Sequence, residues 1–338
     1  MKKLISIIVP AFNEEEVVEL FHQRMGDIFD RLPNYRCEMI FVNDGSTDRT
    51  KQVIEKLCLM DKRICSIELS RNFGKEAAMT AGLDMAQGDA VAIFDVDLQD
   101  PPELLFQFVE KWEAGFDVVY ARRTHRDGES YIKKATAALF YQLMKKISKV
   151  SIPADTGDCR LMSRRVVLSL GHLREHHRFM KGLFAWVGYP AVAVDYRRDP
   201  RAAGTTKFNY WKLWNFALEG ITSFTIAPLK FATYIGTLIA VISFVMGIWI
   251  ILRTLIWGDV VRGYPTLIVT VLFLGGVQLF FIGIIGEYLG RIFGETKNRP
   301  LYLVADYKPS IIESPEKLKS SSQAQLALYK CIQCQNRL

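Results

Sequence analysis

Two aspartates one residue apart, Asp95 and Asp97, are followed by Gln99 directly after a short apolar run. The run, residues 90–94, predicts a buried strand, and side chains two positions apart in an extended segment point to the same side. We therefore expect the three polar side chains to face one site. Neighbouring carboxylates are unfavourable unless a cation neutralises them, and oxygen ligands suit Mg²⁺ or Mn²⁺ with positions left open for substrate phosphates. The alternative is an acidic loop that caps the helix starting at residues 101–102.

Two further polar clusters, residues 10–14 and 43–48, follow apolar runs at residues 5–9 and 38–42. Small and acidic side chains in these positions can hold ribose hydroxyls and the N–H edge of a base. The chain contains neither of the glycine-rich phosphate loops, Gly-x-x-x-x-Gly-Lys-Ser/Thr and Gly-x-Gly-x-x-Gly. The sequence therefore predicts a nucleotide site that holds its diphosphate through a metal.

Short apolar runs alternate with longer helical patterns over the first 120 residues. We predict strands at residues 5–9, 38–42, 64–69, 90–94 and 117–121, and helices at 14–31, 76–86 and 102–114. Repeated strand–helix units indicate an α/β fold with a mostly parallel, Rossmann-like sheet covered on both faces. Ligands bind beyond the carboxyl ends of such strands, which is where the polar clusters fall.

Two runs without a charged side chain, residues 231–252 and 264–286, are each long enough to cross a bilayer. We predict a transmembrane hairpin over residues 231–293; the alternative is a pair of buried core helices. Flanking lysines and arginines favour both termini in the cytoplasm. Residues 294–338 form a cytosolic C-terminal segment that we expect to be flexible from about residue 310, and its Cys331-x-x-Cys334 pair lacks the four ligands of a zinc site.

The formal net charge of +7 is unevenly distributed along the chain. Residues 1–130 carry a net charge of −8, residues 131–230 of +11 and residues 231–338 of +4. Within the basic part, residues 131–150 and the aromatic segment 207–230 predict amphipathic helices on a lipid headgroup layer; ordinary surface helices are the alternative. The charge therefore indicates an anionic membrane surface, and we expect no nucleic acid partner.

The three clusters at residues 9–14, 42–48 and 94–103 together resemble the family-2 glycosyltransferases with the GT-A fold. Four motifs and the hairpin narrow the resemblance to the polyprenyl-phosphate glycosyltransferases within that family. The motifs are residues 71–75 (Arg-Asn-Phe-Gly-Lys), 95–101 (Asp-Val-Asp-Leu-Gln-Asp-Pro), 157–164 (Gly-Asp-Cys-Arg-Leu-Met-Ser-Arg) and 201–208 (Arg-Ala-Ala-Gly-Thr-Thr-Lys-Phe). The resemblance is strongest to the bactoprenol (undecaprenyl-phosphate) glucosyltransferases of bacteria and their phages. It extends from Lys3 to roughly Leu303 and makes residues 1–206 the GT-A domain.

The resemblance implies a role for each matching residue. It assigns the sugar-nucleotide pocket to Pro10, Asn13 and Glu14, the uracil to Asp44, and the metal to Asp95, Asp97 and Gln99. The residues that it implies for binding the donor or acceptor phosphates are Lys75, Arg122, Arg201 and Lys207. Asp158 would lie beside the acceptor phosphate, as a base or a positioning group. Many relatives carry Asp-Asp-Gly-Ser where this chain has Asn43-Asp44-Gly45-Ser46, so any role of a carboxylate at position 43 is lost.

The implied enzyme is an inverting glycosyltransferase of the bacterial inner membrane. It would move glucose from UDP-glucose to undecaprenyl phosphate, giving a lipid-linked monosaccharide for O-antigen or other envelope glycosylation, with a flippase and an acceptor glycosyltransferase acting downstream. Gly286-x-x-x-Gly290 permits close helix contact and favours a homo-oligomer. The alternatives are a donor such as GDP-mannose or an amino-arabinose nucleotide, and a non-catalytic membrane scaffold. A processive polysaccharide synthase would need a Gln-x-x-Arg-Trp segment and more spans.

Overall fold

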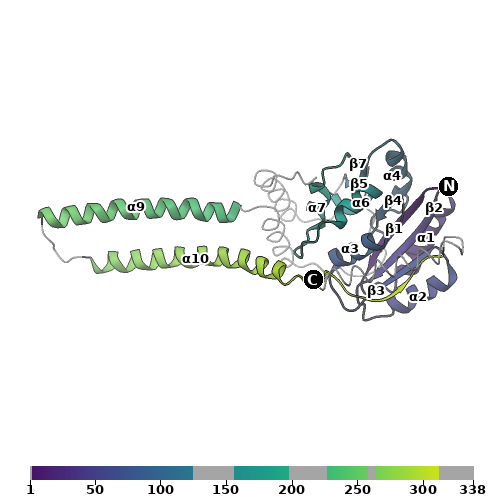
Figure 1. Cartoon of the computed structure of the whole chain (residues 1–338), viewed down its shortest axis with the longest axis horizontal. Coiled ribbons are helices and arrows are strands. Elements are labelled where there is room, and N and C mark those ends of the chain that lie inside the picture. The colour runs from purple at the N-terminus through teal and green to yellow at the C-terminus, as the bar shows by residue number, and fades with distance from the viewer. Residues whose placement is uncertain (1, 125–155, 198–226, 258–262, 312–338) are drawn as a thin grey trace.

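The computed structural model describes residues 2–124, 156–197, 227–257 and 263–311 (Figure 1). Several predictions lie outside these residues. They are the basic helix at 131–150, Arg201, Lys207, nearly all of the aromatic segment 207–230, and the tail from residue 312 with Cys331 and Cys334.

An eight-stranded sheet forms the centre of the N-terminal domain, in the order β7-β5-β6-β4-β1-β2-β3-β8. Its parallel core consists of β1 (Leu4–Ala11), β2 (Arg36–Asn43), β3 (Ile64–Leu69) and β4 (Ala90–Ile93). These strands are almost continuously apolar because both faces of the sheet are covered. The mostly parallel α/β sheet that the sequence predicts is therefore confirmed.

Helices cover both faces of this sheet. One face packs against α1 (Val18–Asp30), α2 (Thr50–Met60) and α4 (Leu104–Glu113). The other packs against α3 (Lys75–Met85), α6 (Arg164–Gly171) and α7 (Met180–Trp186). Two separate apolar clusters result, one on each face, and they hold the strand ends at fixed positions.

Two strands run against the parallel core. β6 (Thr156–Ser163) lies between β4 and β5 (Val118–Arg123) and is antiparallel to both, while β7 (Ala191–Tyr196) pairs in parallel with β5. At the opposite edge, β8 (Val304–Lys308) pairs antiparallel with β3. The insertion of β6 has the larger consequence, because it places the first residues of β6 beside the last residues of β4.

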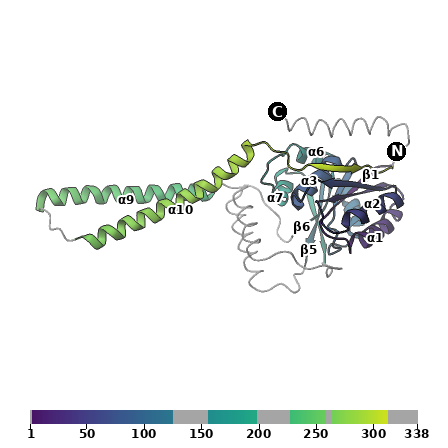
Figure 2. The same cartoon turned by 90° about the horizontal axis from the view of Figure 1, so that it is seen from below.

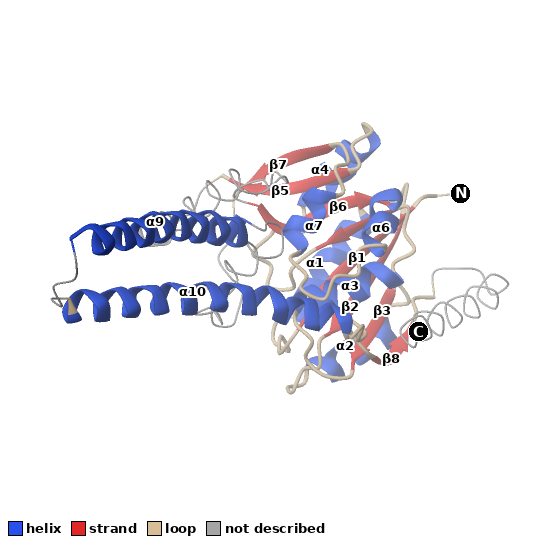
Figure 3. Cartoon of the chain, turned by 60° about the vertical axis from the view of Figure 1, so that its left-hand side comes forward, coloured by secondary structure: helices blue, strands red, loops and turns tan. Residues whose placement is uncertain are grey.

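The C-terminal helices α9 (Ala227–Trp257) and α10 (Tyr264–Thr296) form a hairpin that projects from the α/β domain (Figures 1 and 3). Both are long and apolar enough to cross a membrane. Each extends beyond its charge-free run; in α10 the extension is polar and contains the pair Glu287–Arg291, 3.1 Å apart.

The end of α10 is fastened to the α/β domain. Glu295 accepts a hydrogen bond of 2.8 Å from the backbone N–H of His176, and its other oxygen lies 3.0 Å from Nδ1 of the same histidine. Seven residues further along, the Tyr302 hydroxyl donates to Asp84 at 2.7 Å. The chain then enters β8, so contacts on both sides of the connection hold the hairpin to the sheet.

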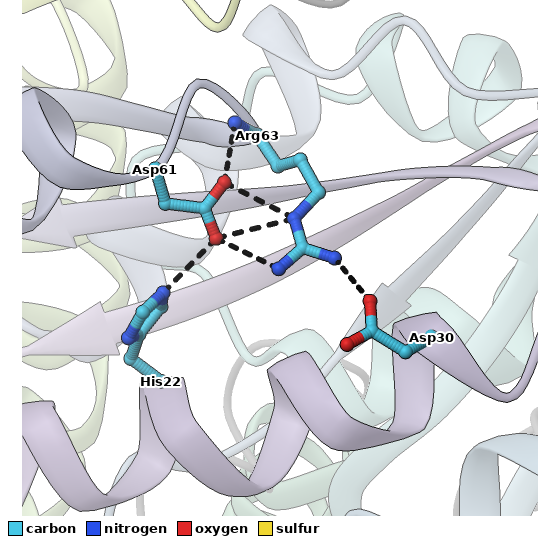
Figure 4. Close-up of polar contacts among 4 residues, drawn as sticks. All are labelled: His22, Asp30, Asp61 and Arg63. Atoms are coloured by element: carbon cyan, nitrogen blue, oxygen red, sulfur yellow. Dashed lines mark hydrogen bonds and ion pairs between the residues drawn. The ribbon is translucent and has the colours of Figure 1, made fainter.

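A polar cluster links α1 to the turn between α2 and β3 (Figure 4). Arg63 donates to both oxygens of Asp61 at 2.9 to 3.1 Å and to Asp30 at 2.9 Å, and His22 lies 3.1 Å from Asp61. Arg63 directly precedes β3, so the cluster lies at the amino ends of the parallel strands. The residues predicted to do chemistry lie at the other end of these strands, beyond their carboxyl ends.

Candidate active site

A lysine bridges two aspartates at the carboxyl end of β4. The antiparallel register pairs Ile93 with Arg160, so Asp95 and Asp158, two residues further in opposite directions, meet just beyond the paired strands. Lys75 is the first residue of α3, and its Nζ lies 2.6 Å from Oδ1 of Asp95 and 2.6 Å from Oδ2 of Asp158. Three residues from three separate motifs are thus in direct contact.

The bridge determines the protonation of Asp158. Burial on its own opposes ionisation of this carboxyl, but Lys75 and then Lys181 outweigh that effect and hold its pKa well below the usual range. The two carboxylates in turn raise the pKa of Lys75 in spite of burial. Asp158 is therefore a carboxylate at neutral pH and has little tendency to take up a proton.

The predicted metal ligands lie on a tight turn after β4. Leu98 adopts a left-handed conformation with φ of 57°, and the N–H of Gln99 donates to Oδ1 of Asp97 at 3.2 Å. Asp100 is fully buried and accepts a hydrogen bond from the Tyr196 hydroxyl, which fixes the end of the turn. Among the described residues no group of three His, Cys, Asp or Glu side chains is gathered around one point. The donor set that fits Mg²⁺ or Mn²⁺ is two carboxylates and an amide, Asp95, Asp97 and Gln99.

The loops after β1 and β2 are locked together by Asn13. This residue has φ of 54°; its side-chain oxygen accepts the N–H of Thr47 at 2.8 Å, and its own N–H donates to the Ser46 hydroxyl at 2.9 Å. The neighbouring N–H of Glu14 donates to the hydroxyl of Thr50 at 2.9 Å. Pro10 lies within β1, opposite Val42. The predicted nucleotide residues therefore line one edge of the sheet.

Asp44 is tied to the loop that precedes Lys75. Its two carboxylate oxygens accept the N–H groups of Phe73 and Gly74 at 2.7 and 2.9 Å. Gly74 has φ of 97°, a conformation that side-chain-bearing residues rarely adopt. In this structure Asp44 thus positions the start of α3, in addition to any contact with a base that the resemblance implies.

The contacts of Asn43 explain why this chain departs from the Asp-Asp-Gly-Ser pattern. Its amide nitrogen donates to Glu68 at 2.8 Å on the adjacent strand, and its amide oxygen accepts the N–H of Ser46 at 3.2 Å. An aspartate here would retain the second contact but would place a carboxylate against Glu68. The amide preserves the turn while avoiding that repulsion.

The two arginines that end β5 point in different directions, as successive strand residues do. Arg122, which the resemblance selects for phosphate, is half exposed and donates to Asp195 of β7 at 2.6 and 2.9 Å. Arg123 turns toward the site, donates to the Tyr196 hydroxyl at 3.1 Å and lies 4.0 Å from Asp100. Arg123 is therefore the member of the pair nearer the acidic turn.

Besides Arg123, sequence reasoning missed two further residues at the site, Glu76 and Lys181. Glu76 accepts the N–H of Met180, the first residue of α7, at 3.0 Å. Burial, reinforced by Asp158, raises the pKa of Glu76 to about 8. Its position directly after Lys75 was the available signal; Lys181 belongs to no motif and could be found only from the packing of α7.

Two protein-family models match the sequence of this chain. The family model described as "Glycosyl transferase family 2" matches residues 6–171, and the one described as "GtrB C-terminal hairpin" matches residues 227–292. Among solved structures, mannosyl-3-phosphoglycerate synthase from Rubrobacter xylanophilus is 18% identical, with a TM-score of 0.46, over 64% of this chain and 71% of that one.

Close relatives extend over both parts of the chain. A bactoprenol glucosyl transferase of Shigella phage SfX is 50% identical over 90% of this chain and 99% of its own length. An SfII prophage-derived bactoprenol glucosyl transferase of Shigella flexneri is 51% identical over 89% and 97%. A prophage bactoprenol glucosyl transferase homolog of Escherichia coli K12 is 49% identical over 90% and 99%. With a family-2 domain on a GT-A sheet and an apolar hairpin after it, the chain belongs to the family-2 glycosyltransferases, in the group that contains the bactoprenol glucosyl transferases.

Proposed function

We propose that this glycosyltransferase moves glucose from UDP-glucose to undecaprenyl phosphate at the cytoplasmic face of the bacterial inner membrane. One observation carries the proposal: an ionised Asp158 is held 2.6 Å from Lys75 beside the Asp95–Gln99 turn. This arrangement supports a reaction that brings two phosphate-bearing substrates together. The names of relatives at about 50% identity support glucose as the sugar and a bactoprenol carrier as the acceptor.

In the proposed reaction an oxygen of the acceptor phosphate attacks the anomeric carbon of glucose. A new bond forms between that carbon and the acceptor oxygen, the bond to the β-phosphate oxygen of UDP breaks with its electron pair, and the configuration is inverted. A phosphate monoester has its second pKa at about 6 and is mostly a dianion at neutral pH. The nucleophile therefore needs orientation more than it needs a base.

The low pKa of Asp158 agrees with that requirement. A carboxylate held ionised by Lys75 is a weak base, so we assign Asp158 to the orientation of the acceptor, with Lys75 offsetting its charge. Asp95, Asp97 and Gln99 would hold Mg²⁺ or Mn²⁺, which supplies positive charge to the diphosphate leaving group. Asn13, Glu14, Pro10 and Asp44 would line the nucleotide side, and Arg122, Arg201 and Lys207 remain proposed phosphate contacts.

The hairpin supports a membrane-bound acceptor. Large apolar side chains on α9 and α10 are exposed, for example Phe244 at 70% and Leu279 at 71%, which favours contact with lipid. We propose that both helices span the membrane and that both chain termini lie in the cytoplasm. The lipid-linked glucose would then pass to a flippase and an acceptor glycosyltransferase. Gly286 and Gly290 leave α10 open to close helix contact, and we propose a homo-oligomer formed there.

Membranes containing the full chain, incubated with undecaprenyl phosphate and a panel of labelled sugar nucleotides, test the proposal. We expect label from UDP-glucose to enter a glycolipid in Mg²⁺ or Mn²⁺ and not in EDTA. Transfer from GDP-mannose or an amino-arabinose nucleotide alone would change the donor. No glycolipid from any donor would reject the function.

A further inference from the structure

A hollow lies between α7 and the strands β5, β6 and β7. Its lining includes Tyr120, Thr156, Arg160, Lys181, Phe184 and Tyr189. These residues supply two cations and several aromatic rings, and no carboxylate is among the described residues that line it. The hollow is therefore a positively charged recess with apolar walls.

Lys181 is a cation in this recess that pairs with none of the residues the structure describes. Within the described ranges its ammonium group forms no hydrogen bond or ion pair, and Asp158, the acid that raises its pKa, is already bound to Lys75. Burial lowers the pKa of Lys181, an effect that Asp158 only partly opposes. A cation partly withdrawn from water without a counter-ion is unfavourable, so an anionic ligand would stabilise it.

Arg160 supplies a second cation in a fixed orientation. It is 5% exposed, donates to the carbonyls of Gly157 and Asp158 at 2.9 and 3.2 Å, and its guanidinium carbon lies 3.7 Å from the centre of the Phe184 ring. Burial lowers its pKa to about 10, which leaves it charged at neutral pH. A planar guanidinium held in this way is well suited to a phosphate group.

Residues that line the recess are connected to the reacting groups on one side and, through α7, to the hairpin on the other. Arg160 is hydrogen-bonded to the backbone of Asp158, so a ligand on Arg160 is adjacent to the Lys75–Asp158 pair. The helix α7 is at the end of the α/β domain that faces α9 and α10 (Figures 1 and 2). Just before α7, His176 contacts Glu295 of α10 at 2.8 Å. A lipid headgroup arriving along the hairpin would therefore meet this recess.

From these observations, and resting on the proposed function, we propose that Lys181 and Arg160 bind the phosphate monoester of the acceptor lipid in this hollow. The donor sugar is neutral and would leave both cations without a counter-ion. The donor diphosphate is assigned to the Asp95–Gln99 turn, where a divalent cation offsets its charge. The acceptor phosphate is thus the substrate anion that remains to pair with Lys181 and Arg160.

Equilibrium binding to the full-length protein in detergent, without any sugar nucleotide, tests this assignment with three probes: undecaprenyl phosphate, undecaprenol and UDP. In Lys181→Gln we expect the affinity for undecaprenyl phosphate to fall roughly tenfold or more, because a charge-assisted hydrogen bond is lost. The affinities for undecaprenol, which lacks the phosphate, and for UDP should not change. Lys181→Arg should restore most of the loss, and Lys56→Gln, at an exposed lysine paired with Glu19, should match the wild type.

Three results would overturn the assignment. The first is an unchanged affinity for undecaprenyl phosphate in Lys181→Gln. The second is an equal loss of UDP binding, which would place Lys181 on the donor. The third is an equal loss of undecaprenol binding, which would indicate a disrupted fold. Because no donor is present, the assay is independent of glucose transfer. A protein that binds undecaprenyl phosphate through Lys181 but transfers no sugar would reject the proposed function and keep this inference.

Discussion

The Nζ of Lys75 lies 2.6 Å from Oδ2 of Asp158, across 83 positions of sequence. The contact exists because β6 is inserted antiparallel beside β4, which brings Asp158 to the N-terminus of α3. It converts a buried carboxyl, which on its own would favour the protonated form, into a stable carboxylate. The ionised state of Asp158 therefore depends chiefly on Lys75, with smaller contributions from Lys181 and Arg160.

Replacing this lysine should change the pH dependence of catalysis. In Lys75→Met, burial raises the pKa of Asp158 without opposition from Lys75, so Asp158 takes up a proton at a higher pH than in the wild type. We expect transfer activity to fall at least about 100-fold and the acidic limb of the pH–rate profile to move to higher pH. Lys75→Arg, which keeps the charge, should retain a wild-type limb. An unshifted limb in Lys75→Met would contradict the assignment.

Removing a proposed metal ligand should abolish metal-dependent turnover. Asp97→Asn keeps the size of the side chain but removes the charge that would hold Mg²⁺ or Mn²⁺, so we expect a loss of roughly 1,000-fold that added metal does not restore. Glu103→Gln, at an exposed acid paired with Arg24, is the matched control. The readout is the rate of glycolipid formation as a function of Mn²⁺ concentration. Full activity in Asp97→Asn would remove this residue from the site.

The raised pKa of Glu76 predicts a loss of stability as the pH rises from about 4.5 to about 8. The folded state holds this proton up to a pH of about 8, whereas the ordinary value is 4.5, so the folded state binds more protons in the interval between them. Stability due to this group therefore decreases as pH rises through that window. We expect the thermal midpoint to fall between pH 6 and pH 9, and to fall less in Glu76→Gln, whose amide oxygen can still accept the N–H of Met180. Identical pH dependence in the two proteins would exclude a buried, protonated Glu76.

The cluster in Figure 4 predicts a separate loss at acidic pH. Although burial opposes ionisation, Arg63 and His22 lower the pKa of Asp61 to about 2 from the usual 3.8. The stabilisation is fully present when the pH is above the usual pKa of 3.8, and it is lost as the pH falls toward 2. It amounts to about 1 to 2 kcal/mol once solvent screening is considered. Asp61→Asn should lower the thermal midpoint at pH 7 without changing the KM for either substrate; a changed KM would argue against a purely structural role.

The parallel core could be predicted because each of its strands is a short, continuous apolar run. The strand Ile64–Leu69 has the bounds expected from the sequence. The antiparallel strands were harder to predict from the sequence. The strand β8 is a half-polar edge strand, and β6 lies within a motif whose residues suggested chemistry instead of strand pairing. The helix α10 continues to Thr296 because its last turns are held by polar contacts with the domain, which a search for charge-free runs does not detect.

The candidate site was predictable as a set of residue types and not as a set of contacts. Asp95, Asp97 and Gln99 could be grouped from their spacing, but the extended segment expected there is a tight turn in the structure, with Leu98 at φ of 57°. The pairing of Lys75 with Asp158 depends on the register of β6, and the approach of Lys181 depends on how α7 packs. The sequence pointed to Arg122 and not to Arg123, because the packing of β5 against its neighbouring strands decides which of the two arginines faces the site.

The most direct test is the identity and anomeric configuration of the lipid product, determined by mass spectrometry and NMR after reaction of the full-length protein with UDP-glucose and undecaprenyl phosphate. The account predicts a single β-linked glucosyl phosphate on undecaprenol, formed with release of UDP and absent from the Asp97→Asn reaction. An α-linked product would contradict inversion, and the absence of any glucolipid would contradict the proposed function.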